Sequence, residues 1–341
     1  MVAVTKKIPH PVSFTIRISN LDKNIKHIKS VFLWPCLQLW YLAIFTFLPF
    51  QNLNAAKLSK LKVVTTFTIL HDMAKEVAGD NAEVVCLVKY GAEIHNYEPT
   101  PQDLVKIQNA NLILWNGLNL EKWFEKFFAS QKNVKQVIVT TGIKPLNILI
   151  GSYANAPNPH AWMTPPNGKI YIENIRNALS EIDPINKNNY FQNAANYLKK
   201  LEQLEQKILN LFRQIPSEAK WLATSEGAFT YLTNHYSFQE LYLWPINADQ
   251  QGSPKQIQKA VESIRKHKIA AIFSESTISD KPAKQVANEA PTLYGGKLYV
   301  DSLTVSGGEV PTYLLLLESN AITIAKSILN GLKWQRNSLK R

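Results

Sequence analysis

A long stretch near the middle of the chain, Asn188–Gln214, contains neither glycine nor proline. Its apolar residues recur at the spacing of an amphipathic α-helix, and they are Phe191, Ala194, Ala195, Leu198, Leu201, Leu204, Ile208, Leu211 and Phe212. At 1.5 Å per residue this helix would be about 40 Å long, which is more than one small domain needs. A coiled-coil dimer is the alternative, but the apolar stripe is short and lies mid-chain. We therefore interpret residues 188–215 as a linking helix between two lobes.

Short β-branched runs alternate with helical stretches on both sides of this linking helix. Predicted strands are Lys62–Phe67, Ala82–Val88, Leu112–Trp115, Val137–Thr140, Trp221–Ser225, Ala270–Ser274 and Lys297–Val300. Predicted helices are Leu70–Ala78, a stretch around Leu120–Phe128, Phe229–His235, Pro254–His267, Lys281–Glu289 and Pro311–Leu332, with one more opening at Thr100. Such alternation indicates parallel sheets with helices on both faces. The expected fold class is α/β with two lobes, each a mainly parallel sheet flanked by helices, joined by one long linking helix. The N-terminal lobe is expected at 57–187 and the C-terminal lobe at 216–341.

The first 56 residues have the layout of an export signal. Residues 31–50 carry no charge, a basic stretch precedes them, and Asn54-Ala55-Ala56 supplies small residues after them. The apolar run is also long enough to span a bilayer, so an uncleaved N-terminal anchor is the alternative. Lipid attachment at Cys36 is not expected, because Leu33-Trp34-Pro35 precedes it in place of small residues. Either reading predicts a periplasmic or other extracytoplasmic location.

The formal charge of +12 does not by itself indicate nucleic-acid binding. Residues 1–56 contain six basic residues and one acid, so the rest of the chain carries +7. Its Lys and Arg are spread along predicted helices close to acids, and no nucleic-acid module signature appears. Once the leader is set aside, Cys86 is the only cysteine, and its strand-like surroundings favour a small core residue over a ligand.

Two histidines and two carboxylates stand where predicted strands end. His95 lies between a strand and a helix N-terminus, and His160 lies in a loop before a helix. Glu226 and Asp301 each follow a predicted strand directly. Ligands of open α/β sheets bind at the carboxyl ends of strands, and a charged side chain at a buried strand end is costly unless it is paired or metal-bound. Taken singly, each residue also fits a structural role, such as a helix cap, a salt bridge or a solvated histidine.

Four short motifs occur in the order found in a known family. They are the His95 loop with Tyr97 and Pro99, Pro159-His160-Ala161-Trp162-Met163, Ser225-Glu226-Gly227-Ala228-Phe229 and Tyr299-Val300-Asp301-Ser302-Leu303. From about Lys62 to Leu332 the chain resembles the zinc/manganese solute-binding proteins of bacterial ABC transporters, most closely the manganese-binding type. The resemblance implies two α/β lobes joined by one long helix. It also implies a metal held by His95, His160, Glu226 and Asp301, two from each lobe. One departure is Glu93, where the family more often has Asp.

The ligand set favours manganese as the cargo. Two imidazoles and two carboxylates carry a charge of −2, which balances a divalent cation, and oxygen-rich ligation suits Mn²⁺ better than Zn²⁺. Zinc carriers of the family typically have a third histidine where Glu226 stands and a His-rich loop after the first ligand. No histidine lies between His95 and His160. Zn²⁺ and Fe²⁺ are the alternatives.

The resemblance implies a non-enzymatic protein that delivers metal to the permease and ATPase subunits of an ABC importer. A metalloenzyme is one alternative, because two histidines with a carboxylate also form non-haem iron sites, but four protein ligands leave little room for a substrate. A surface adhesin is another, although the chain has no separate adhesive module. We expect a monomer that binds no nucleic acid and meets the membrane through its leader or its transporter.

Overall fold

The computed structural model describes residues 60–124, 133–247 and 252–338. Residues 59–341 form one compact unit, separate from residues 1–58. The expected export signal therefore lies outside the described residues, as do residues 125–128 of the helix expected around Leu120–Phe128, whereas residues 122–124 are helical. Within the described ranges, no helix is long and apolar enough to cross a membrane.

The N-terminal half of this unit contains a four-stranded parallel sheet in the order β2-β1-β3-β4. Its strands are β1 (Leu61–Thr65), β2 (Ala82–Cys86), β3 (Leu112–Trp115) and β4 (Lys135–Ile138), and its helices are α2 (Thr68–Ala78), α3 (Pro101–Ile107) and α5 (Pro165–Ile182). Neighbouring residues of β1 face opposite sides: Val63 packs in the core that includes α2 and α5, and Val64 packs with Ile107 of α3. Both faces of the sheet are therefore covered.

The C-terminal half repeats this plan with the sheet order β6-β5-β7-β8, again parallel. Its strands are β5 (Trp221–Glu226), β6 (Gln239–Trp244), β7 (Ala271–Glu275) and β8 (Leu293–Leu298), and its helices are α7 (Thr230–Tyr236), α8 (Pro254–His267), α9 (Lys281–Glu289) and α10 (Tyr313–Ser338). Ile272 packs against α8 and α9, whereas Phe273 points into the core shared with α10. The fold class expected from the sequence is confirmed.

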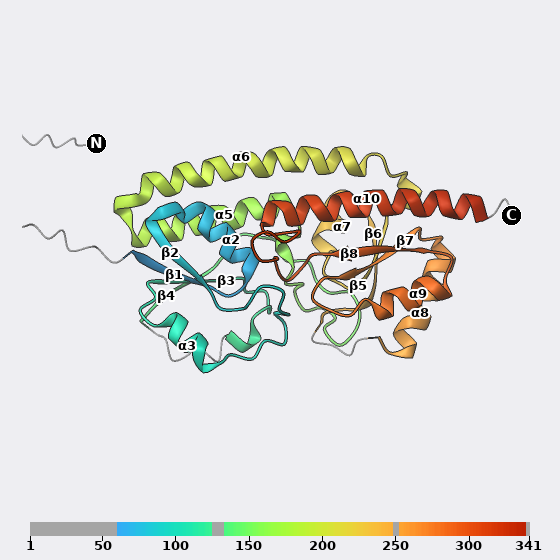
Figure 1. Cartoon of the computed structure of the whole chain (residues 1–341), viewed down its shortest axis with the longest axis horizontal. Helices are drawn as coiled ribbons and strands as arrows, with labels where there is room; N and C mark the ends of the chain where they lie inside the picture. Colours follow the sequence, from blue (N-terminus) through green and yellow to red (C-terminus); the bar gives the residue numbers. More distant parts are fainter. Residues whose placement is uncertain (1–59, 125–132, 248–251, 339–341) are drawn as a thin grey trace, which may run out of the picture. The chain divides into compact units, whose positions relative to one another are not determined.

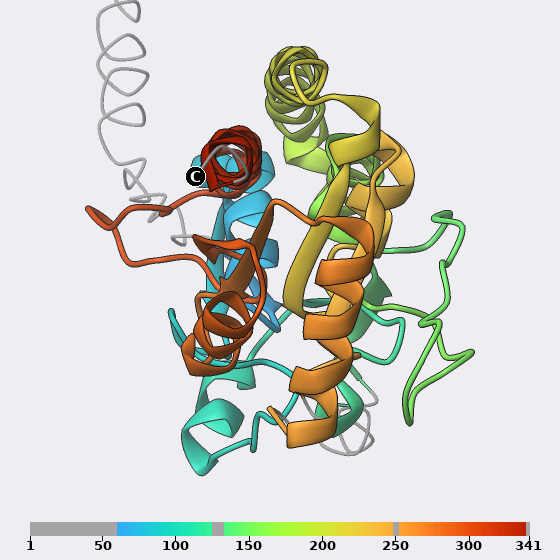
Figure 2. The same cartoon turned by 90° about the vertical axis from the view of Figure 1, so that its right-hand side faces the viewer.

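Two long helices lie on the same side of the molecule (Figures 1 and 2): one reaches over the N-terminal sheet, and the other runs from the middle of the molecule over the C-terminal sheet. One is α6 (Lys187–Phe212), the expected linking helix, which spans about 39 Å at 1.5 Å per residue. The other is α10, which packs against α6 and β8. Its first residue reaches back to the N-terminal half: Tyr313 N donates to Asp72 Oδ2 (2.9 Å), and its ring lies where a side chain on Gly168 of α5 would have to be. Both helices therefore tie the two halves together.

One continuous apolar core extends through both halves. It joins Val63 and Leu114 of the first sheet to Leu222 and Phe273 of the second, through the buried face of α6. Because 59–341 is one compact unit, the residue limits of the two expected lobes stay a prediction.

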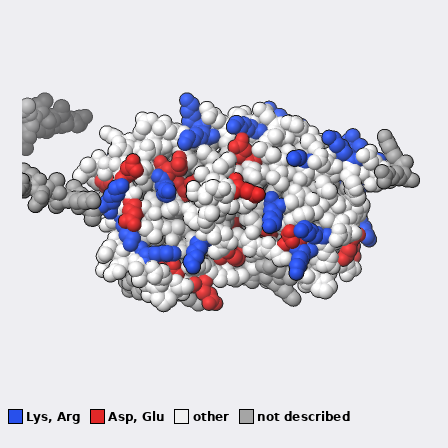
Figure 3. Space-filling view, viewed as in Figure 1, with Lys and Arg blue, Asp and Glu red and all other residues white. Residues whose placement is uncertain are grey.

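Some elements differ from the sequence-based expectation. Strand β6 was not expected, because it begins with the polar residues Gln239-Glu240 and so lacks a strand-like run of apolar residues at that end. The last strand was expected at Lys297–Val300 but spans Leu293–Leu298, since Gly295-Gly296 reads as a break in a single sequence. On the face shown in Figure 3, Lys and Arg are interspersed with Asp and Glu and form no continuous basic surface.

Candidate metal centre

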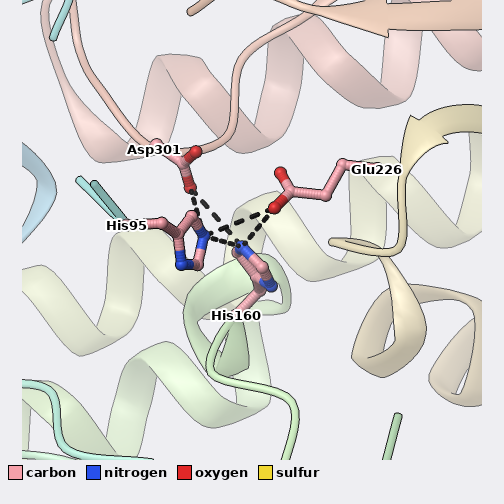
Figure 4. A group of neighbouring side chains, drawn as sticks. All are labelled: His95, His160, Glu226 and Asp301. Carbon is pink, nitrogen blue, oxygen red and sulfur yellow. Dashed lines mark hydrogen bonds and ion pairs between the residues drawn. The ribbon is translucent and has the colours of Figure 1, made fainter. Parts of the chain in front are cut away.

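The four side chains singled out in the sequence meet at one point between the two sheets (Figure 4). His95 comes from the loop that joins β2 to α3, and His160 from the segment after β4. Glu226 is the last residue of β5, and Asp301 follows β8. Because the strands of each sheet are parallel, their carboxyl ends share one edge, and the two edges face each other. One nitrogen or oxygen atom from each residue lies within 4.8 Å of the others.

The spacing of these atoms suits a small cation. His95 Nε2 lies 3.1 Å from His160 Nε2 and 3.3 Å from Glu226 Oε1. His160 Nε2 lies 3.7 Å from Glu226 Oε1 and 3.5 Å from Asp301 Oδ1, and His95 Nε2 lies 3.9 Å from the same Asp301 oxygen. A regular tetrahedron of ligand atoms about 2.1 Å from its centre has edges of about 3.4 Å. The five distances scatter around this value, from 3.1 to 3.9 Å, so the cluster is close to the size that a small cation requires.

Asn158 fixes the orientation of the His160 ring. The side-chain oxygen of Asn158 accepts hydrogen bonds from His160 N (3.1 Å) and His160 Nδ1 (2.8 Å). Its amide nitrogen donates to Gly227 O (2.6 Å) and Thr230 Oγ1 (3.0 Å). Since the carbonyl of Gly227 can only accept, the amide cannot flip, and the proton of His160 must be on Nδ1. The lone pair of His160 Nε2 is therefore directed at the cluster, as a metal ligand requires.

Asn247 holds both carboxylates. Its backbone N donates to Glu226 Oε1 (2.7 Å), and its side-chain Nδ2 donates to Asp301 Oδ2 (3.4 Å). Among the described residues, no hydrogen-bond donor reaches Glu226 Oε2 or Asp301 Oδ1, although both atoms are buried. Buried carboxylate oxygens without a donor are costly. A bound cation would supply the missing partner.

Burial shifts the proton affinity of every group in the cluster. It lowers the pKa of His160 to about 3 and lowers that of His95, where Asp301 opposes the effect. It raises the pKa of Asp301 and raises that of Glu226 strongly, with repulsion between the two carboxylates adding to the shift of Glu226. The imidazoles are therefore neutral at pH 7 and ready to coordinate. The raised pKa values make both carboxyls hold a proton more readily, and any proton on them must leave when a divalent cation binds.

Two further carboxylates border the cluster. Glu275, the last residue of β7, is fully buried and accepts a hydrogen bond from Glu226 N (3.1 Å). Burial raises its pKa to about 8. Glu93 accepts from His95 N (2.9 Å), and burial together with the nearby charge of Asp301 raises the pKa of Glu93 to about 7. These two acids lie beside the four proposed ligands, and each adds negative charge to the site only in its deprotonated form.

Sequence reasoning gave no role to Asn158, Asn247 or Glu275. Glu275 carries the same signal as Glu226, a carboxylate directly after a predicted strand, and that signal could have identified it. Asn158 stands two residues before a candidate ligand, which is a usable signal. Asn247 follows a strand that was not expected, so its sequence gave no comparable sign.

The chain was compared with protein families and with curated proteins. A family model described as zinc-uptake complex component A, periplasmic (ZnuA) matches residues 63–327. The iron-binding protein YfeA of Yersinia pestis is 53% identical over 294 residues, which cover 83% of this chain and 94% of YfeA. The manganese ABC transporter substrate-binding lipoprotein PsaA of Streptococcus pneumoniae is 36% identical over 276 residues, covering 79% of this chain and 89% of PsaA.

Solved structures show the same architecture. The Mn-bound periplasmic metal-binding protein of Candidatus Liberibacter asiaticus superposes with a TM-score of 0.74 at 43% identity. The match covers 79% of this chain and 100% of that protein.

Proposed function

Because the chain belongs to the ZnuA family of substrate-binding proteins of metal ABC transporters, we propose that it captures one divalent cation through His95, His160, Glu226 and Asp301, with Mn²⁺ as the cargo. Members of this family bind and deliver metal and are not enzymes, which removes the metalloenzyme alternative. As the substrate-binding component of a metal ABC transporter, the chain works with a permease and an ATPase.

The observation that carries the proposed site is the meeting of four buried ligand atoms, together with two buried carboxylate oxygens, Glu226 Oε2 and Asp301 Oδ1, that have no hydrogen-bond donor among the described residues. Two neutral imidazoles and two carboxylates compensate the charge of a divalent cation.

Manganese is favoured by the second oxygen of Glu226. Glu226 Oε2 is buried without a donor from the described part of the chain, so Glu226 can bind through both oxygens and raise the coordination number above four. Mn²⁺ accepts such oxygen-rich, expanded coordination more readily than Zn²⁺ does. Iron is the second candidate, since the relative YfeA is named as an iron-binding protein.

We further propose that residues 1–56 export the chain, that it acts outside the cytoplasm as a monomer, and that 57–187 and 216–341 act as lobes around the linking helix. Relatives are named as periplasmic proteins or as lipoproteins. A monomer suffices because all four proposed ligands come from one chain.

The test measures metal in the cell and on the purified protein, because affinity alone favours late transition metals whatever the true cargo. Protein isolated from its native compartment should carry one Mn²⁺ per chain, and cells dependent on this transporter should lose Mn²⁺ uptake with Asp301→Asn or His160→Ala. Iron or zinc bound in place of manganese would correct the cargo alone. A wild-type protein without any bound divalent metal, or variants with undiminished binding, would refute the site.

A further inference from the structure

Glu93 connects the two halves of the protein at the rim of the metal cluster. It lies in the N-terminal half, two residues before His95, and its Oε1 accepts a hydrogen bond from His95 N (2.9 Å). Its Oε2 accepts from two residues of the C-terminal half, Asn247 Nδ2 (2.8 Å) and Thr277 Oγ1 (3.2 Å). We call the contacts among Glu93, Asn247 and Thr277 the rim bridge.

The rim bridge is linked directly to the proposed ligands on both sides. On one side, Glu93 holds the backbone of His95. On the other, Asn247 donates to Glu226 Oε1 and Asp301 Oδ2 (2.7 and 3.4 Å). A rotation of the Glu93 carboxylate therefore affects a histidine of one half and, through Asn247, the carboxylates of the other.

The rim bridge lies where the cluster is nearest to solvent. Of the four proposed ligands, His95 is the only residue that is not fully buried, and Glu93 and Thr277 are half-buried. Two more hydrogen bonds link the His95 loop to the C-terminal half, from Asn96 Nδ2 to Asn247 O (3.2 Å) and from Gly91 N to Ser302 Oγ (2.7 Å). Deeper between the halves, Trp162 Nε1 donates to Val300 O (3.0 Å), and both residues are buried. Separation of the halves at the rim must break the bonds to Glu93, and it can do so while the deeper contacts stay intact.

We propose that the rim bridge of Glu93, Asn247 and Thr277 retains the captured cation by holding the His95 loop against the C-terminal half, so that it sets the rate of metal release. This inference rests on the proposed function of the site. A carboxylate acceptor makes stronger hydrogen bonds than a neutral one, and the two bonds across the rim have no counterpart once the His95 loop moves outward. The cation enters before the bridge closes, so the bridge affects dissociation more than association.

Thr277 allows the sharpest test, because it touches none of the four proposed ligands in the contacts described above. Thr277→Val keeps the shape of the side chain and removes the hydroxyl, whereas Thr277→Ser keeps the hydroxyl. Glu93→Asp keeps the negative charge, and its shorter side chain can still accept the hydrogen bond from His95 N two residues later. The same shortening withdraws the carboxylate from Asn247 and Thr277.

The measurement is the dissociation rate of Mn²⁺ from the full chain, followed by transfer to a chromophoric chelator, together with the association rate. We expect dissociation to be about fivefold faster for Thr277→Val and about tenfold faster for Glu93→Asp, with association within twofold of wild type and one Mn²⁺ still bound per chain. Thr277→Ser should restore the wild-type rate. In the double variant, Thr277→Val should add little to Glu93→Asp, because the hydroxyl has already lost its acceptor.

Dissociation rates within twofold of wild type for both variants, or strictly multiplicative effects in the double variant, would overturn the rim bridge and leave the proposed metal site standing. A lowered melting temperature of the metal-free variants without a faster release would show a structural role only, and would also overturn it. Failure of the wild-type chain to bind Mn²⁺, Fe²⁺ or Zn²⁺ would refute the proposed function and the rim bridge together.

Discussion

The orientation of His160 depends on one hydrogen bond, and its removal should weaken metal binding without removing a ligand. In Asn158→Ala the acceptor for His160 Nδ1 disappears, so the ring can rotate and the proton can move to Nε2, which blocks coordination. Loss of such an orienting partner typically costs 10- to 100-fold in metal affinity, or about 1.4–2.8 kcal/mol at 1.4 kcal/mol per tenfold. Asn158 is 1% exposed, so water cannot readily replace the lost acceptor.

The same substitution also lowers stability, and a second variant separates the two effects. Asn158→Ala leaves the buried carbonyl of Gly227 without its donor, which costs about 1–3 kcal/mol. Thr230→Val removes another partner of the Asn158 amide, at 3.0 Å, and leaves the bond to His160 Nδ1 intact. We expect both variants to melt at lower temperature and only Asn158→Ala to lose Mn²⁺ affinity in a competitive chelator titration. Equal affinity losses in the two variants, or none in Asn158→Ala, would refute the assigned role of Asn158.

Four further predictions concern the pH dependence of binding and of stability, helix α6 and metal-linked stability. Because burial raises the pKa values of Glu226 and Asp301, protons compete with metal for these groups, so Mn²⁺ affinity should fall as the pH is lowered, with measurable proton release on binding; calorimetry that gives the same heat in buffers of different ionisation enthalpy would contradict this. Burial raises the pKa of Asp72 to about 6, above its unfolded value of about 3.9, so protonated Asp72 stabilises the fold at low pH and this contribution is lost as the pH rises through about 6. Asp72→Asn should therefore gain stability over wild type between pH 4.5 and 7.5, by less than about 3 kcal/mol. A difference in unfolding free energy between variant and wild type that stays the same at every pH in urea unfolding would exclude this role of Asp72. Replacing exposed Glu202 and Gln203 of α6 by glycines should lower the free energy of unfolding by about 2 kcal/mol relative to alanines at the same positions and should weaken Mn²⁺ binding. Mn²⁺ at 1,000 times its Kd should raise the stability of residues 59–341 by about 4.1 kcal/mol in one unfolding transition. Separate melting of the two halves, or unchanged Mn²⁺ binding in the glycine variant, would contradict the linking role of α6.

The sequence predicted the features that depend on local pattern. The linking helix was expected at 188–215 and observed at Lys187–Phe212, because a long amphipathic stripe without glycine or proline has few other solutions. His95, His160, Glu226 and Asp301 were singled out by their places at strand ends, since parallel strands present their carboxyl ends at one edge, and by the motifs that surround them. Taken singly, each of these residues also fitted a structural role, and the resemblance to a known family was what implied that the four converge.

The contacts around the proposed ligands were less accessible, because they depend on which strands are neighbours. Glu275 supports Glu226 only because β7 lies beside β5, and the order β6-β5-β7-β8 is not written in any local pattern. Asn247 reaches two carboxylates through its backbone and its side chain at once. To predict this role one would have to know the path of the chain after β6, and the periodicity of apolar residues does not reveal that path.

The apolar core that passes from one sheet to the other has a consequence for how relatives of this protein can diversify. Exchange of one half for that of a relative would bring unmatched side chains against Leu222, Phe273 and Tyr313. Cavities and overpacking at such positions cost about 1–5 kcal/mol each, and a few of them would exhaust a stability of about 5–15 kcal/mol. New cargo preferences should therefore arise by substitutions in the loops at the strand ends, whereas recombination of intact halves should produce chains that do not fold.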